Sequence, residues 1–275
     1  MASLQIVLTA ARVTLSLAFL LYASWSDYKT REVSNCVWMF FGPIALVLSI
    51  SELLLYDVGR LPWFGLVLGV ITAFALLLFY AGGFGGADSK ALICIALALP
   101  FFPDKLLTLF LVDGLSPLAQ NIFPFTIFSN SILVAAASVI VMLLINTKQR
   151  LASGKHVFEG TLAAESVWKK ILVLMTGYKV PLARLQEKWH VYPMEDIIEE
   201  ESDETSLKRK LLVMPKDEGR KEIVDRLSMA VASGKIDSLV FATPGLPMLI
   251  FITVGLIISL FFGDIVWLLI RLFAG

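Results

Sequence analysis

Long apolar stretches, separated by short polar segments, dominate the chain. A helix needs about 20 apolar residues to cross the hydrocarbon core of a bilayer. Six stretches reach or approach this length: Ile6–Ser26, Val37–Tyr56, Trp63–Gly82, a stretch from Asp88 to between Pro100 and Leu111, Phe123–Ile145, and Met248–Ile270. The fourth is the weakest because its prolines cut it short. Since runs of this length leave no polar face, the pattern argues against a soluble helical protein.

A charged segment interrupts this pattern between Asn146 and Phe241. Between Thr147 and Ser238 lie 16 of the 23 Lys and Arg residues and 15 of the 23 Asp and Glu residues, although the whole chain of 275 residues is 57% hydrophobic and 17% charged. The zero net charge therefore combines an apolar body with a charged insert. We predict an all-α membrane protein with six transmembrane helices, divided into residues 1–145, a soluble insert at 146–241, and a last helix within 242–275.

The insert contains one clear helix candidate and one acidic run. The apolar segment Ser166–Met175 predicts a helix that ends at Gly177. The acidic run Glu195–Glu204 is followed by three consecutive basic residues at 208–210. A run of like charge is usually a solvated or disordered face, and we interpret it so; binding of a basic partner segment is the alternative.

Basic residues in the short loops indicate the orientation of the helices. Lys29 and Arg31 lie in the loop after the first span, and Lys90 follows the third, whereas the opposite side has Arg60, Lys105 and Arg271. This asymmetry predicts a multi-pass protein of the cytoplasmic membrane with the insert in the cytoplasm and both termini outside. The N-terminal stretch lacks a basic region and a cleavage site, so we interpret it as a retained span. Arg12 would then extend towards the outer surface.

Composition and motifs exclude several other classes of function. Balanced charge gives no reason to expect a nucleic-acid partner. Cys36 and Cys94 form no C-x-x-C motif and are interpreted as small buried apolar residues, and His156 and His190 as surface residues. The chain has no H-E-x-x-H, G-x-S-x-G or phosphate-binding loop. We therefore expect no metal and no cofactor.

Two acidic residues at the membrane boundary are the candidates for chemistry. Asp27 ends the first span and Asp88 begins the fourth, and an ionisable residue at this boundary is a functional candidate by default. The alternative is two ordinary interfacial carboxylates. The glycine-rich run 82–86 before Asp88 removes side chains from its approach, which suits a docked peptide; a flexible hinge is the other interpretation.

A pair of carboxylates can hydrolyse a peptide bond without a metal. Two like charges held close together cannot both ionise, so the pair shares one proton. The ionised member can then accept a proton from water while the protonated member donates one to the carbonyl oxygen.

The segments around both residues resemble the archaeal type IV prepilin peptidase family, in particular the preflagellin (prearchaellin) peptidases, within the wider GxGD intramembrane aspartyl proteases. Four segments carry the resemblance: Asp27-Tyr28-Lys29-Thr30-Arg31-Glu32-Val33-Ser34-Asn35, Gly85-Gly86-Ala87-Asp88-Ser89-Lys90, Gly177-Tyr178-Lys179-Val180-Pro181 and Ala242-Thr243-Pro244-Gly245-Leu246-Pro247. The two Asp motifs together are specific, and the resemblance extends over nearly the whole chain. Ala87 stands where the GxGD pattern has its second glycine.

The resemblance implies an aspartic endopeptidase that removes class III signal peptides from archaellin or pilin precursors at the cytoplasmic membrane face. The four-cysteine motif of the methylating bacterial relatives is absent, which implies cleavage without N-methylation. The resemblance makes Asp27 and Asp88 catalytic, and gives a substrate-binding or supporting place to Lys29, Arg31, Asn35, Gly85, Gly86, Ala87 and Lys90.

Two other classes of function compete with this hypothesis. A small transporter could use Asp27 and Asp88 for proton coupling, but both are predicted near one membrane face rather than at the midplane, and the chain shows no internal repeat. A membrane scaffold without enzymatic activity could instead display the insert.

Overall fold

The computed structural model describes residues 2–107, 109, 114–154, 157–199, 207–213, 219–245 and 247–274. His156, Leu246, residues 200–204 of the acidic run, and the end of the fourth apolar stretch at Leu111 lie outside the described residues. The chain forms two compact units: Met1–Ala135 with Pro247–Gly275, and Ala136–Leu246.

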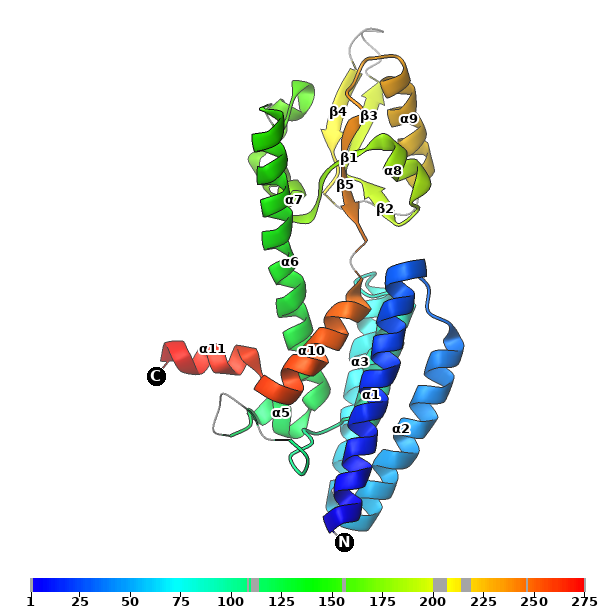
Figure 1. Ribbon diagram of the computed structural model, residues 1–275, viewed down its shortest axis with the longest axis vertical. Coiled ribbons are helices and arrows are strands. Elements are labelled where there is room, and N and C mark those ends of the chain that lie inside the picture. Colours follow the sequence, from blue (N-terminus) through cyan, green and yellow to red (C-terminus); the bar gives the residue numbers. More distant parts are fainter. Residues whose placement is uncertain are drawn as a thin grey trace. The chain divides into compact units, whose positions relative to one another are not determined.

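The first unit is built from helices (Figure 1). They are α1 (Ala2–Thr30), α2 (Asn35–Tyr56), η1 (Val58–Arg60), α3 (Leu61–Tyr80), α4 (Gly86–Ala98), α5 (Pro117–Asn121), the first part of α6 (Phe123–Ser153), α10 (Met248–Phe262) and α11 (Ile265–Ala274). Helix α1 packs against α2, α4 and α10, and α4 packs against α2 and α3. Helix α4 therefore contacts three of the long helices of the unit.

Among the described residues, four helices are long and apolar enough to cross a membrane: those at 4–30, 35–56, 58–80 and 123–152. They correspond to the first, second, third and fifth predicted stretches, which confirms a membrane protein. Helix α4 has 13 residues and spans roughly 20 Å at 1.5 Å per residue, too short to cross a hydrocarbon core of about 30 Å alone. The last stretch is bent by 55° between α10 and α11, and counts as a fifth span only if both helices are taken together.

Apolar side chains fill the interior of this unit. Phe41 of α2, Leu20 of α1, Ile95 of α4 and Leu256 of α10 are fully buried in one cluster. The rings of Phe19 and Phe41 stack at 5.1 Å between centroids. This packing holds α1, α2, α4 and α10 together in one bundle.

Arg12 corrects the expectation that its side chain reaches the outer surface. It is 8% exposed, and its Nη2 lies 2.6 Å from Oε2 of Glu52 on α2. A charge buried among apolar helices is stable only when it is paired, and Glu52 supplies the partner.

The second unit contains two small antiparallel sheets, so the all-α prediction is wrong for the insert. One sheet has the order β1 (Tyr178–Pro181), β5 (Leu239–Pro244), β2 (Val191–Pro193), and the other pairs β3 (Glu195–Glu199) with β4 (Leu207–Leu211). Helices η2 (Gly160–Ala164), α7 (Val167–Thr176), α8 (Leu182–Glu187) and α9 (Arg220–Ala232) complete the unit. The strands are three to six residues long, which is too short to stand out from a charged background.

The helix predicted from Ser166 is confirmed as α7. Ser166 is its N-cap, with the side chain accepting a hydrogen bond from the backbone N–H of Lys169. Gly177 is its C-cap, and a Cβ there would lie 2.7 Å from the carbonyl oxygen of Ala242. Glycine is therefore required at this point because β5 passes too close for a side chain.

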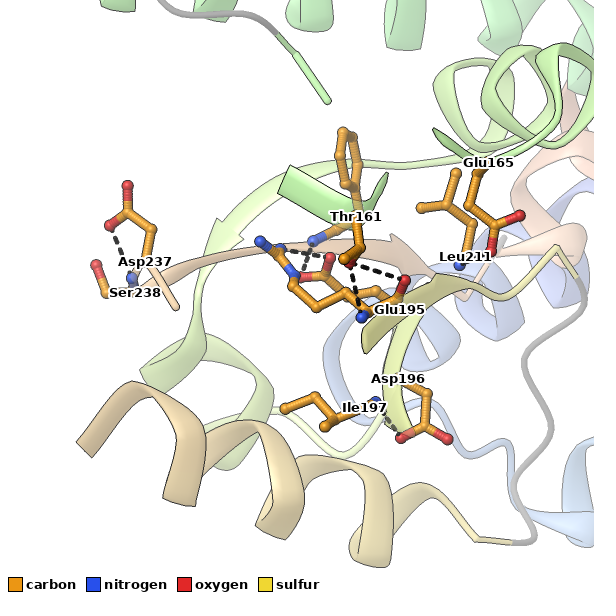
Figure 2. Close-up of polar contacts among 10 residues, drawn as sticks. Thr161, Glu165, Glu195, Asp196, Ile197, Leu211, Asp237 and Ser238 are labelled. Atoms are coloured by element: carbon orange, nitrogen blue, oxygen red, sulfur yellow. Dashed lines mark hydrogen bonds and ion pairs between the residues drawn. The ribbon is translucent and has the colours of Figure 1, made fainter. Parts of the chain in front are cut away.

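The first part of the acidic run is not the solvated face that its charge predicts. Glu195 and Ile197 of β3 are both buried, whereas Asp196 between them is partly exposed, as the alternation of side chains along a strand predicts. Glu195 is fully buried: its Oε2 lies 2.6 Å from Nη2 of Arg209, and its Oε1 accepts from the backbone N–H of Phe241 at 3.1 Å. Figure 2 labels Glu195 and Thr161, both of which bond to Arg209: the backbone N–H of Arg209 donates to the Thr161 hydroxyl at 2.8 Å. These contacts link β3, β4, β5 and η2.

Candidate active site

Asp27 lies in the last turn of α1, just before the helix ends. The backbone of Arg31 adopts φ 57°, a left-handed conformation that stops the helix, and its N–H donates to the Asp27 carbonyl at 2.9 Å. The side chain of Asp27 is partly exposed. The positive charge of Arg31 acts on its carboxylate, so these two predicted residues are neighbours.

Asp88 lies in the first turn of α4, where the helix dipole favours a negative charge. Its Oδ2 accepts a hydrogen bond from the backbone N–H of Gly85, the N-cap residue, at 3.1 Å. A Cβ built on Gly85 would lie 3.1 Å from the same oxygen. The glycine therefore lets the backbone close on the carboxylate, and a side chain at 85 would crowd it.

The structure places the two aspartates on helices that contact each other. Helices α1 and α4 contact each other, and Asp27 is near enough for its negative charge to act on Asp88. The two residues come from the C-terminal end of one helix and the N-terminal end of the other, so the helices run in opposite directions at this point. The packing of α1 against α4 thus places two residues that are 61 positions apart in the sequence within range of each other's charge.

The other predicted residues surround this pair in different ways. Nζ of Lys90 on α4 donates to Oδ1 of Asn35 at the start of α2 at 2.7 Å. Lys29 lies 4.4 Å from the ring centroid of Trp25, one turn earlier on α1. Lys90 and Asn35 therefore join α4 to α2 beside the site, while Lys29 packs on its own helix.

The residues of the glycine-rich segment before Asp88 differ in how much they need to be glycine. Gly82 adopts φ 74°, which favours glycine, and Gly85 is exposed. A Cβ at Gly86 would meet only the edge of the Phe79 ring at 3.7 Å, an ordinary contact. Ala87 packs against the apolar core through its methyl group. The methyl group at 87 thus has room, and the position without room is Gly85.

Ser89 is a residue of the site that sequence reasoning did not single out. It is buried, and its hydroxyl donates to the carbonyl oxygens of Ala75 on α3 and of Gly85, both at 3.2 Å. It fixes the first turn of α4 to α3. A polar residue next to a candidate catalytic carboxylate, at the start of an apolar stretch, is the signal that could have revealed it.

This geometry suits acid–base chemistry by two carboxylates. Both are partly exposed, so water can reach them, and one holds a backbone hydrogen bond that orients it. Within the described residues, no group of three or more His, Cys, Asp or Glu side chains could hold a metal ion. The chemistry available to the pair is the shared-proton activation of a water molecule.

Comparison with known proteins places this arrangement in context. Residues 14–137 match the type IV leader peptidase family, and residues 169–265 match the family described as Archaeal Peptidase A24 C-terminus Type II. The chain is also similar to the preflagellin peptidase of Methanococcus voltae, with 24% identity over 254 residues, 89% of this chain and 92% of that protein. The first match contains both Asp27 and Asp88, and the second covers most of the insert together with α10.

Proposed function

We propose that this chain, which belongs to the type IV leader peptidase family, removes class III signal peptides from archaellin and pilin precursors. As an archaeal preflagellin and prepilin peptidase, it is a membrane protease. The placement of Asp27 and Asp88 on contacting helices, within range of each other's charge, carries the proposal. It supplies a carboxylate pair at the ends of two helices, where an apolar segment meets water. The same chemistry needs no cofactor.

In the proposed mechanism, the two aspartates share one proton. Asp88 is oriented by the backbone N–H of Gly85, and Asp27 lies within reach of the charge of Arg31. The ionised carboxylate takes a proton from the attacking water, and the protonated one donates to the scissile carbonyl oxygen. Either aspartate can fill either role, because the proton belongs to the pair.

The substrate would reach this pair along the exposed backbone of the glycine-rich segment. An extended peptide needs backbone donors and acceptors beside it, and the segment 82–86 offers them without large side chains other than Phe84. The apolar helix of a precursor would lie against the membrane-spanning helices. Hydrolysis leaves a leader peptide and a new amino terminus; with two cysteines in the chain, we propose that no methyl group follows.

We propose that the fourth apolar stretch, which begins with α4 and continues beyond Pro100, and the bent α10–α11 pair complete a six-span topology. The insert 146–241 is then cytoplasmic, and the carboxylates face the cytoplasm. The positive charges of the short loop 27–35 support this orientation. Single cysteines at Lys29, Arg60 and Ser153, labelled from each side of sealed vesicles, test it. Lys29 and Ser153 should react from the cytoplasmic side and Arg60 from the other. Reaction of Lys29 and Arg60 from the same side would contradict the topology.

Cleavage by purified protein is the direct test of the function. The protein, in lipid vesicles, is mixed with a precursor that has a short basic leader, a glycine before the cleavage site and an apolar helix. We expect a product shortened by the leader, and no product from the same precursor with proline after the glycine. Absence of cleavage by folded protein, or proton flux without cleavage, would favour the scaffold or the transporter instead.

A further inference from the structure

A second polar cluster lies inside the first unit, away from the two aspartates. Arg12 and Glu52 form a buried ion pair between α1 and α2, with Nη2 of Arg12 2.6 Å from Oε2 of Glu52. Thr9 donates to the other oxygen of Glu52 at 2.9 Å. An ion pair buried between apolar helices is costly, and such groups in membrane segments usually have a functional reason. The hydrolytic chemistry of the two aspartates does not use the Arg12–Glu52 ion pair.

The contact of Arg12 with α4 suggests what that reason is. Nη1 of Arg12 donates to the carbonyl oxygen of Ala98 at 3.0 Å, and Ser49 of α2 donates to the carbonyl oxygens of Leu97 and Ala98 at 2.6 and 3.2 Å. These are the last carbonyl groups of α4, which a helix leaves without partners at its C-terminal end. Side chains of α1 and α2 therefore cap the end of α4.

This cap and the aspartates lie at opposite ends of α4, and on α1 Arg12 lies near the middle of the helix while Asp27 lies in its last turn. Along α1, Arg12 is 15 residues from Asp27, or roughly 22 Å, and along α4, Ala98 is 10 residues from Asp88, or roughly 15 Å. Both helices run between the two clusters in opposite directions. Helix α4 is short and ends before Pro100, so it has no continuing helix to fix its position along α1. A bond at its C-terminal end can set how far it slides against α1.

We propose that Arg12 is a positioning residue for proteolysis. Supported by Glu52 and Ser49, it holds the C-terminal end of α4 against α1 and α2 and thereby sets the separation of the Asp27 and Asp88 carboxylates. The inference rests on the proposed function of the two aspartates. Ser89 and Lys90 tie the first turn of α4 to α3 and α2, and the bond of Arg12 to Ala98 adds a charged, directional tie to α1.

A paired substitution tests the inference without leaving a lone buried charge. Arg12→Met/Glu52→Met removes the ion pair and the bond to Ala98 together, and replacing both partners of a buried pair by apolar residues is often tolerated. Thr9 keeps its second acceptor, the carbonyl oxygen of Gln5. The matched control is Lys105→Gln, which removes a basic residue of the same unit whose contact with Asp104 is more than half exposed.

Two measurements separate positioning from general stability. Cleavage kinetics should show kcat reduced about 10- to 100-fold with KM within about twofold, since small misplacements of catalytic groups act on the chemical step. The second measurement needs no activity: Asp27→Cys/Asp88→Cys, in a Cys36→Ser/Cys94→Ala background, is cross-linked with a short thiol reagent. The paired substitution should slow this cross-link at least threefold, by the same misplacement. The Lys105→Gln control should change neither result.

Wild-type kcat and an unchanged cross-linking rate in folded Arg12→Met/Glu52→Met protein would overturn the inference. Failure of the proposed function looks different, because Asp27→Asn or Asp88→Asn would then keep cleaving. If the paired variant does not fold, Arg12→Lys takes its place. Lysine keeps the charge but has one nitrogen instead of the guanidinium fork, so it cannot hold Glu52 and Ala98 in the same geometry. We expect lower kcat at unchanged thermal stability, and wild-type kcat in this variant would also overturn the inference.

Discussion

Two pairs of acidic residues, one in each unit, have different neighbours. In the insert, Glu195 lies 2.6 Å from Arg209, and the adjacent Asp196 lies 2.8 Å from Arg226. In the first unit, the charge of Asp27 acts on another aspartate, Asp88, and Asp27 is also within reach of the charge of Arg31. The two acids of the insert each form an ion pair with an arginine, which neutralises them and holds β3 in place. An acid beside an acid shares a proton and is poised to transfer one.

The first unit also contains an acid, Glu52, that forms an ion pair with an arginine. Glu52 is paired with Arg12, as Glu195 is with Arg209, and both acids are buried. Burial raises the pKa of Glu195, although the charge of Arg209 opposes the change. The neighbour of an acid therefore says more about its role than the part of the chain in which it lies.

The largest effect should follow substitution of either aspartate of the first unit. We expect Asp27→Asn or Asp88→Asn to reduce cleavage at least about 1,000-fold, because an amide can neither accept nor share the proton. Thermal unfolding should stay within a few degrees of the wild type, since both side chains are partly exposed. Cleavage of a precursor by vesicle-bound protein measures the first effect.

The double substitution tests whether the two aspartates act as one catalytic unit. If the two aspartates act as one unit, Asp27→Asn/Asp88→Asn should be no worse than either single variant, because residues that work together are not additive. The pH profile of the wild type should be bell-shaped and report the pair. Near-normal turnover by Asp27→Asn would show that Asp88 works with another partner.

In the insert, loss of an acid should affect folding rather than chemistry. Glu195→Ala leaves Arg209 buried without its partner and the Phe241 N–H without its acceptor, which we expect to cost about 3–5 kcal/mol of insert stability. Protease resistance of the insert in the full-length protein measures this cost. Cleavage per folded molecule should stay within about threefold of the wild type, and a catalytic loss as large as that of Asp27→Asn would break the comparison.

The pH dependence of Glu195 has a definite sign. Because the pKa of Glu195 is raised in the folded protein, the folded state binds a proton more tightly than the unfolded chain. Its contribution to stability therefore grows as the pH falls from the raised folded pKa towards the ordinary value of 4.5. Glu195→Gln should remove this contribution, which protease resistance at a series of pH values would detect.

Substitutions at two nearby small residues, Gly85 and Ala87, should affect cleavage differently. Gly85→Leu should reduce cleavage about 100-fold, because its Cβ would already lie 3.1 Å from Oδ2 of Asp88 and would misplace it. Ala87→Gly should keep or raise activity, since it only removes a methyl group that packs on the core. A Gly85→Leu protein with normal turnover would contradict the role assigned to this backbone.

Most of the first unit could be predicted from the sequence because a membrane span is defined by composition and length. The starts and ends of α1, α2, α3 and α6 follow the apolar stretches closely, with α6 continuing to Ser153 beyond the predicted end at Ile145. The bend between α10 and α11 was not predictable by hydropathy, since both sides of it are apolar. It occurs at Gly263, which has φ 73°, and Asp264.

The insert and the interior polar contacts were harder to predict for a different reason. The pairing of Glu195 with Arg209 joins residues 14 positions apart, across a strand pair that the charge pattern conceals. Arg12 and Glu52 are 40 positions apart, and hydropathy treats each as an isolated defect in a span. Sequence patterns report the local environment of a residue, whereas these contacts depend on which elements pack together.

The smallest effect on stability should come from substitution of Asp196, the second acid of the insert. It tests how much an exposed ion pair contributes. Arg226 donates to the Asp196 carboxylate through Nη2 at 2.8 and 2.9 Å and through Nε at 3.1 Å. The Arg226 side chain is 40% exposed and that of Asp196 is 19% exposed. Solvent screens such a pair, so Asp196→Asn should cost about 0.5–1 kcal/mol, less at high salt. The same protease-resistance measurement, at low and high salt, tests it. Glu195→Ala should show little salt dependence, because burial excludes ions. If Asp196→Asn matched the loss caused by Glu195→Ala, exposure would not separate the two pairs, and the arginine partner alone would account for both.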